Sequence, residues 1–282
     1  DSGIDGKHSW IIDCNPGVQD IIVIPHSSYF IVIDPTLFVP PKSDLDIKAI
    51  TIEHGRNDIE IAAKNINQLL GDLGKECPIY KGSEFILSLI KLGSPDPIVQ
   101  QKIVVSPTDL DNKEFGRYVT KHHLIAIEPL RNESKSKAEN IQEIHAAEGI
   151  VKVATENPGT ERLILSDCLG TINILCLGPL TNLALAYHLD PKLKEKINRI
   201  ILLGGALHQT GNLSKSGEYN FASDPHAASL VITAFGDKCT LVPLEVSNKC
   251  ILDEAEIESI VIIDVNTLTL IDWNFEFRDY IS

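Results

Sequence analysis

The sequence has few positive charges and no apolar stretch long enough to cross a membrane. Its 25 Lys and Arg residues stand against 39 Asp and Glu residues, for a formal net charge of −14. A surface that binds phosphates needs clustered Lys and Arg, so this balance argues against nucleic acid as a partner. The longest apolar stretches, within residues 21–33 and 260–263, are broken or bounded by Pro, His, Asp or Ser. None reaches the ~18–20 residues of a membrane-spanning helix, so no membrane partner is expected.

The sequence also lacks Met altogether and has no Cys-x-x-Cys pair. Its six Cys residues are scattered, which argues against a zinc site. Cys176 lies inside an apolar run, which favours a buried, reduced thiol. No signal peptide is visible, which favours a cytoplasmic protein; secretion is the alternative, since the chain begins at Asp1 and not at Met.

The order of apolar runs predicts strands that alternate with helices. Strands are expected over Trp10–Cys14, Ile47–Ile52, Ile172–Leu177, Arg199–Leu203 and Thr240–Val246, and helices over Ile59–Leu70, Ala138–Glu156, Leu180–Leu189 and Pro225–Phe235. Asp58 and Asp224 precede two of these helices as N-caps. The strands are apolar throughout, a pattern typical of a parallel sheet covered on both faces. We therefore predict an α/β fold, a single domain over residues 1–282 with a central, mainly parallel sheet flanked by helices.

Ligands of such sheets bind at the carboxyl ends of the strands, and four polar clusters follow predicted strands. The first, Asp13–Asp20, is an oxygen-rich loop suited to a hard cation or to sugar hydroxyls. A polar turn that caps the next helix is an alternative of about equal weight. The second, Cys176–Asn182, ends a strand in Gly-Pro, which lets a backbone carbonyl point outward as a calcium ligand. A strand-to-helix turn capped by Thr181 or Asn182 explains this cluster at least as well.

The third cluster runs from Gly204 to Asp224 and contains Asn212, Glu218 and Asn220. These side chains supply enough donors and acceptors to hold vicinal hydroxyls, although a polar surface loop is the simpler interpretation of this cluster alone. The fourth cluster, Pro243–Val246, places Glu245 at the end of a predicted strand. A carboxylate buried there needs a metal or a polar partner; a Glu that reaches solvent is the alternative.

Taken in order, these motifs resemble those of the inosine–uridine preferring nucleoside hydrolase family. The family begins with a strand and Asp-Cys-Asp-Pro-Gly-x-Asp-Asp, and this chain has Asp13-Cys14-Asn15-Pro16-Gly17-Val18-Gln19-Asp20 in register. Further matches follow in the same order as in the family: Ile50-Thr51 with Gly55, Pro78–Gly82, Gly178–Asn182, Gly204-Gly205, and Gly211-Asn212 through Glu218–Phe221 to Asp224-Pro225. The resemblance is strongest over residues 9–250 and implies the nucleoside hydrolase fold.

The resemblance also implies hydrolysis of the N-glycosidic bond of ribonucleosides, with calcium as the cofactor. In the family, calcium binds Asp side chains and a backbone carbonyl, and it holds the ribose 2′ and 3′ hydroxyls and a water that an Asp deprotonates. By position, the metal ligands of this chain would be Asn15, Asp20, the Leu177 carbonyl and Glu245. Asn15 also stands at the position of the general base.

The remaining family positions would bind the substrate. Gln19 stands where an Asp accepts a hydrogen bond from a ribose hydroxyl, and Arg56 stands where an Asn helps to hold the substrate. Asn212, Glu218 and Asn220 match sugar-binding positions, and Tyr219 replaces an aromatic residue that is usually Phe.

Two amides at carboxylate positions, Asn15 and Gln19, weaken the expected chemistry. An amide brings no negative charge to calcium and takes no proton near neutral pH. Loss of the general base alone removes a factor of ~10²–10⁴ in rate. The sequence therefore predicts a nucleoside hydrolase-like protein that binds ribonucleosides, possesses a weakened calcium site and hydrolyses its ligand weakly at most. The alternative is an inactive homologue with a binding, storage or structural role; the family favours a homo-oligomer in either case.

Overall fold

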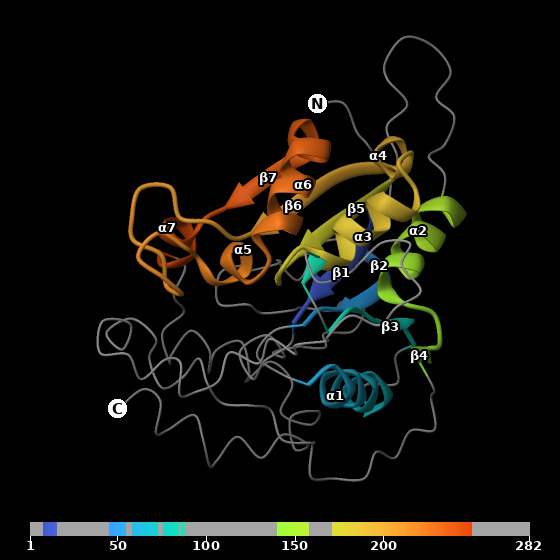
Figure 1. Ribbon diagram of the computed structural model, residues 1–282. Coiled ribbons are helices and arrows are strands. Elements are labelled where there is room, and N and C mark those ends of the chain that lie inside the picture. The colour runs from blue at the N-terminus through green and yellow to red at the C-terminus, as the bar shows by residue number, and fades with distance from the viewer. Residues whose placement is uncertain are drawn as a thin grey trace, which may run out of the picture.

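The structure is a computed structural model that describes residues 8–15, 45–54, 58–72, 76–84, 86–87, 140–157 and 171–249. Within these residues, one sheet contains β1 (His8–Cys14), β2 (Leu45–Ile52), β3 (Ile79–Lys81), β4 (Ile141–Gln142), β5 (Ile172–Cys176), β6 (Ile197–Leu203) and β7 (Cys239–Val242). The strand order is β4-β3-β2-β1-β5-β6-β7, and each neighbouring pair is parallel. The predicted α/β fold with a mainly parallel sheet is confirmed (Figure 1).

Helices cover both faces of this sheet (Figure 1). The longer ones are α1 (Ile59–Asp72) on one face and α2 (Ala146–Glu156), α3 (Thr181–Leu189) and α6 (Pro225–Phe235) on the other. The shorter ones are α4 (Leu193–Lys196), α5 (Tyr219–Ser223), α7 (Leu244–Ser247) and the 3-10 helix η4 (Gly236–Lys238). None of the described helices combines the length and the apolar character that a membrane crossing requires.

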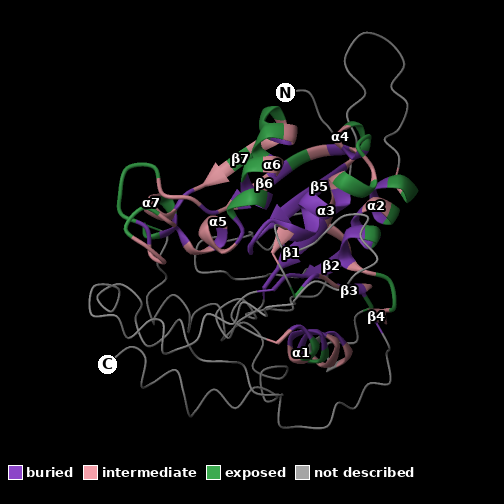
Figure 2. Ribbon diagram, viewed as in Figure 1, coloured by how far each residue is buried: buried purple, intermediate pink, exposed green. Residues whose placement is uncertain are grey.

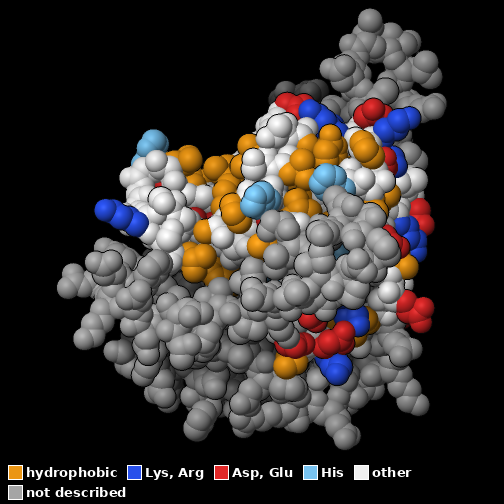
Figure 3. Space-filling model, viewed as in Figure 1, with side chains coloured by type: hydrophobic (Ala, Val, Ile, Leu, Met, Phe, Trp, Pro, Cys, Tyr) orange, Lys and Arg blue, Asp and Glu red, His pale blue; other side chains and the backbone are white. Residues whose placement is uncertain are grey.

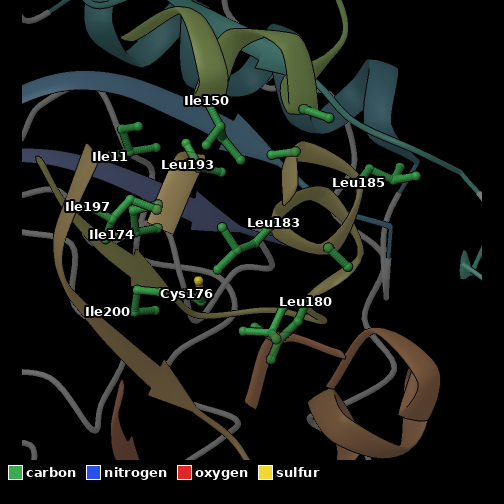
Figure 4. Close-up of a cluster of buried hydrophobic side chains, with 14 of the residues drawn as sticks. Ile11, Ile150, Ile174, Cys176, Leu180, Leu183, Leu185, Leu193, Ile197 and Ile200 are labelled. Atoms are coloured by element: carbon green, nitrogen blue, oxygen red, sulfur yellow. The ribbon is translucent and has the colours of Figure 1, made fainter. Parts of the chain in front are cut away.

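The apolar strands supply both layers of the core, because successive side chains point to opposite faces of a sheet. Ile11 and Ile174 pack with Ile150 of α2 and Leu183 of α3 (Figure 4). Ile12 belongs to the second cluster, on the α1 side of the sheet. Burial of one such side chain contributes ~1.5–3 kcal/mol. The central strand β5 is accordingly buried along its whole length, whereas β7 at the edge of the sheet is only partly buried (Figure 2).

Cys176 lies in the larger core as a free, buried cysteine, which confirms the predicted buried thiol. Burial raises the pKa of this thiol well above its usual value, and that shift keeps the thiol protonated. On the face shown in Figure 3, the described Lys and Arg side chains are scattered, and most of them lie beside Asp or Glu.

Two helices begin directly after the Asp residues predicted to cap them. Asp58 precedes α1, and its Oδ1 accepts a hydrogen bond from the Glu60 N–H at 2.8 Å. Asp224 caps α6, and its Oδ1 accepts from the Ala227 N–H at 3.0 Å, with Pro225 in the first turn. Both arrangements satisfy N–H groups that a helix leaves unpaired at its start.

Three local expectations are wrong. The helix predicted over Ala138–Glu156 begins at Ala146, because residues 141–142 form β4 and the His145 ring caps the helix. The strand predicted over Thr240–Val246 ends at Val242, since Pro243 has no N–H to continue the ladder, and Glu245 lies in α7. Thr181 and Asn182 do not cap α3, whose N-cap residue is Leu180 without a side-chain hydrogen bond.

Candidate functional site

The candidate site lies at the carboxyl edge of the sheet, where β1 and β5 end side by side. The Leu177 N–H donates to the Asp13 carbonyl at 2.7 Å, so the residues after the two strands stay in register. Asn15 packs directly on Gly178: a Cβ added to that glycine would lie 3.2 Å from the Asn15 Cγ. The structure therefore brings together Asn15 and the Leu177–Gly178 peptide, two parts of the site predicted from the sequence.

Asn220 connects this point to the end of β6. Its Nδ2 donates to the Leu177 carbonyl at 3.0 Å and to the Leu203 carbonyl at 2.9 Å. An amide nitrogen carries two hydrogens, so both are used and only the Oδ1 atom remains to accept from a ligand. The residue is 6% exposed, which places this amide inside the edge of the sheet.

Glu218 is the N-cap of α5 and is fixed by three backbone donors. Its Oε2 accepts from the N–H groups of Gly205 and Phe221 at 2.8 and 3.1 Å, and its Oε1 accepts from the Asn220 N–H at 2.9 Å. Gly205 has φ +80°, a left-handed conformation that favours glycine. Asn212 Oδ1 accepts from the Tyr219 N–H at 2.7 Å, which leaves the Asn212 amide nitrogen for a ligand. These four predicted binding residues thus form one hydrogen-bonded group, called the clamp below: Asn212, Glu218, Tyr219 and Asn220.

Glu245 accepts hydrogen bonds from the loop after β6. Its carboxylate accepts from the Leu207 N–H at 3.1 and 3.3 Å and from the His208 N–H at 2.9 Å. Donation from its own N–H and from these two groups lowers the pKa of Glu245. Within the sheet, β5 and β6 separate β7 from β1, so α7 begins three strands away from Asn15.

The other predicted site residues, Gln19, Asp20 and Arg56, lie outside the described residues. Their roles stay predictions.

The described oxygen donors do not fit a strong calcium centre. Asn15 and the Leu177 carbonyl are both neutral, and the carbonyl already accepts from Asn220. Glu245 holds its carboxylate on the loop after β6. Among the described residues, no group of three or more His, Cys, Asp or Glu side chains could hold a metal ion. Calcium affinity depends on the number of charged ligands, and Asp20, the remaining carboxylate expected to bind calcium, lies outside the described residues, so calcium binding stays a prediction.

Behind Asn15 lies a buried polar network that the sequence analysis did not recognise as a unit. Asp13 Oδ1 accepts from Thr51 Oγ1 at 2.6 Å and from Asn182 Nδ2 at 3.0 Å, while its Oδ2 is buried without a partner. Burial raises the pKa of Asp13 to about 7. Glu53 accepts from the Asn182 N–H and from the His54 N–H.

The network continues to α6. The His54 Nε2 lies 2.8 Å from Thr181 Oγ1, which donates to Asp224 Oδ2 at 2.6 Å. Asp224 therefore caps its helix with one oxygen and binds Thr181 with the other. The signal in the sequence is Glu53-His54 directly after an apolar strand, but nothing in local spacing connects that pair to residues 181 and 224.

Comparison with known proteins agrees with this geometry. A family model described as inosine-uridine preferring nucleoside hydrolase matches residues 10–278. The chain belongs to this family. The match covers the whole described sheet apart from the first two residues of β1, and it includes both ends of the candidate site.

The individual relatives share less than 30% sequence identity with this chain. The pyrimidine-specific ribonucleoside hydrolase RihB of Escherichia coli O17:K52:H18 is 29% identical over 249 residues, which are 87% of this chain and 62% of the relative. A plant nucleoside hydrolase structure, the PpNRh1 enzyme, is similar with a TM-score of 0.55 and 25% identity over 85% of this chain and 61% of that one. An inosine-guanosine nucleoside hydrolase structure is 26% identical with a TM-score of 0.53, over 84% of this chain and 62% of that one. The chain thus spans less than two thirds of the length of these relatives.

Proposed function

We propose that this protein binds ribonucleosides at the carboxyl edge of β1, β5 and β6, and that it hydrolyses their N-glycosidic bond weakly at most. The observation that carries the proposal is the position of Asn15, which follows β1 and packs on Gly178 beside the Leu177 carbonyl. In the family resemblance this is the position of the Asp that deprotonates the attacking water. An amide does not take that proton.

Ligand binding is supported by the clamp. Glu218 and Asn220 present oxygen atoms, and Asn212 has an amide nitrogen that its bond to Tyr219 leaves for donation. A ribose offers hydroxyls that both donate and accept, so this mixture of groups suits a sugar. Three backbone N–H groups hold the Glu218 carboxylate in place before any ligand arrives, which reduces the entropy cost of binding.

The other candidate function is an inactive homologue that keeps the fold for binding, storage or a structural role. The neutral Asn15 and the engagement of Glu245 with the Leu207 and His208 N–H groups favour it. We propose that calcium contributes weakly to either function, and no step is assigned to it. The homo-oligomer and the cytoplasmic location expected from the sequence stay predictions.

Two measurements on one preparation separate these functions. Calorimetric titration with inosine and uridine measures binding, and a reducing-sugar assay measures release of ribose. The proposal expects heat of binding for a nucleoside but not for the free base, together with slow ribose release. Absence of binding for both nucleosides contradicts it and leaves the structural role; rapid release contradicts the assignment of Asn15 as an impaired base position.

A further inference from the structure

Glu53 connects the ends of β1 and β2 to the first turn of α3, and the proposed function does not use it. The residue is 1% exposed, and its two carboxylate oxygens accept from different backbone groups: Oε1 from the Asn182 N–H, and Oε2 from the His54 N–H at 3.2 Å. The Glu53 N–H donates to the Cys14 carbonyl at 2.7 Å. The side chain thus joins a strand end to a helix start beside the candidate site.

Asn182 extends this connection to three strand ends. Its Nδ2 donates to Asp13 Oδ1 at 3.0 Å and to the Ile52 carbonyl at 3.1 Å, and its Oδ1 accepts from the Ser83 N–H at 3.4 Å. The Asn182 side chain packs closely against Gly82: a Cβ added to that glycine would lie 2.1 Å from the Asn182 Oδ1, so no larger residue fits there. The position of Asn182 therefore fixes where α3 begins relative to β1, β2 and β3.

The segment just before Asn182 forms one side of the contact with Asn15. It contains the Leu177 carbonyl and Gly178, which packs on Asn15. Only residues 179–181 separate Gly178 from Asn182, and Pro179 restricts the backbone between them. Any shift in the first turn of α3 is therefore transmitted to the contact between Gly178 and Asn15.

Stability alone does not explain a carboxylate at this position. Asp13 and Asp224 are 0% exposed and Glu53 is 1% exposed, and within the described residues no Lys or Arg pairs with them. His54 lies 3.9 Å from Glu53, but burial lowers the pKa of His54 and favours the neutral ring. Burial, and secondly the charge of Asp13, raise the pKa of Glu53 well above its usual value. A buried acid without a cationic partner carries a desolvation cost, which its hydrogen bonds offset only in part.

We propose that Glu53 is a positioning residue: its two hydrogen bonds hold the first turn of α3, and thereby set the Leu177 carbonyl and Asn15 at the spacing that ligand binding requires. The part of this inference that concerns nucleosides rests on the proposed function. The part that concerns the first turn of α3 does not.

The test is the Glu53→Gln variant. Gln has one carbonyl oxygen, so it accepts from one of the two N–H groups and presents its own NH₂ to the other. We expect the amides of Asn182 and Leu177 to exchange with deuterium at least about tenfold faster than in the wild type, and inosine to bind about tenfold more weakly, because one buried donor loses its acceptor. The Tm should fall, because one buried donor loses its acceptor, and the affinity for inosine should fall with it. The matched control is Glu148→Gln on the exposed face of α2, which should change none of these quantities.

Two results would overturn the proposal: exchange and affinity equal to the wild type, or a lower Tm with unchanged affinity, which would assign a merely structural role. If Glu53→Gln does not fold, the wild type decides. Its Asn182 and Leu177 amides must then exchange as slowly as those of β1, and rapid exchange overturns the proposal. The exchange measurement needs no nucleoside. If the wild type does not bind inosine, the proposed function is contradicted, but the exchange rates still decide whether Glu53 holds the first turn of α3.

Discussion

Asn220 joins the ends of two strands by donating both amide hydrogens, one to the Leu177 carbonyl at 3.0 Å and one to the Leu203 carbonyl at 2.9 Å. The same residue matches a sugar-binding position of the family. One side chain therefore fixes the edge of the sheet and has only its amide oxygen left to accept from a ligand.

This double role predicts the effect of Asn220→Asp. The substitution replaces two donated hydrogens with a carboxylate that faces two carbonyl oxygens, so the free energy of unfolding should fall by about 2–4 kcal/mol and nucleoside binding should be lost. Urea unfolding and calorimetry measure these effects. Asn248→Asp, an exposed change of the same kind, is the control. Stability equal to the wild type would show that the two carbonyls do not depend on Asn220.

Thr181 is predicted to matter through its hydroxyl and not through its size. Thr181→Val keeps the volume but removes the group that lies 2.8 Å from His54 Nε2 and donates to Asp224 Oδ2 at 2.6 Å. We expect a loss of about 1–3 kcal/mol in the free energy of unfolding. Thr233→Val on the exposed side of α6 should have little effect. Equal losses for the two variants would mean that the hydroxyl network contributes nothing specific.

The buried side chain of Asp13 should make the stability of the protein depend on pH in an unusual way. Burial raises the pKa of Asp13 from 3.8 to about 7, so between these values the folded protein binds more protons than the unfolded chain. The proton on Asp13 therefore stabilises the folded protein relative to the unfolded chain. This contribution to the free energy of unfolding is complete below pH 3.8 and is lost as the pH rises through about 7. One such proton corresponds to a slope of up to about 1.4 kcal/mol per pH unit.

The measurement is urea unfolding of the wild type and of Asp13→Asn between pH 5 and pH 7. The wild type should lose stability relative to the variant as the pH rises across this window, because only the wild type must ionise a buried acid. Parallel curves for the two proteins would mean that Asp13 does not titrate with a raised pKa.

Calcium should have little influence on this protein. The described donors are neutral at Asn15 and Leu177, and the Glu245 carboxylate accepts from the Leu207 and His208 N–H groups. We predict a calcium Kd of about 10⁻³ M or weaker, and unchanged inosine binding after addition of a chelator. Glu245→Gln should reduce stability by releasing the loop after β6, without altering the response to calcium. Micromolar calcium affinity would contradict this account of the donor set.

Much of the fold follows from local patterns in the sequence. Apolar strands alternate with amphipathic helices, and Asp58 and Asp224 begin their helices as the capping rules require. The helix expected over Ala138–Glu156 is wrong in its first part because short strands such as β4 have no periodicity to detect. The strand expected to reach Val246 is wrong because the apolar run continues past Pro243, where the ladder ends.

Residues of one motif lie together as the sequence suggests, as in the clamp. The site was not predictable where partners are distant in the chain. Glu53 and Asn182 are 129 residues apart, and only the order of β2, β1 and β5 in the sheet brings their segments together. The engagement of Glu245 was missed for the same reason, since its partners are backbone N–H groups that carry no sequence signal.

We propose that Asn15 stands at the general-base position and limits the reaction. The most direct test is the rate of ribose release from inosine and uridine by Asn15→Asp, alone and together with Gln19→Asp, each compared with the wild type under the same conditions. Restoring a proton acceptor beside the Leu177–Gly178 turn should raise the rate by about 10²–10⁴. Asn248→Asp serves as the control and should leave the rate unchanged. A wild-type rate equal to that of Asn15→Asp, with all variants folded, would contradict the claim.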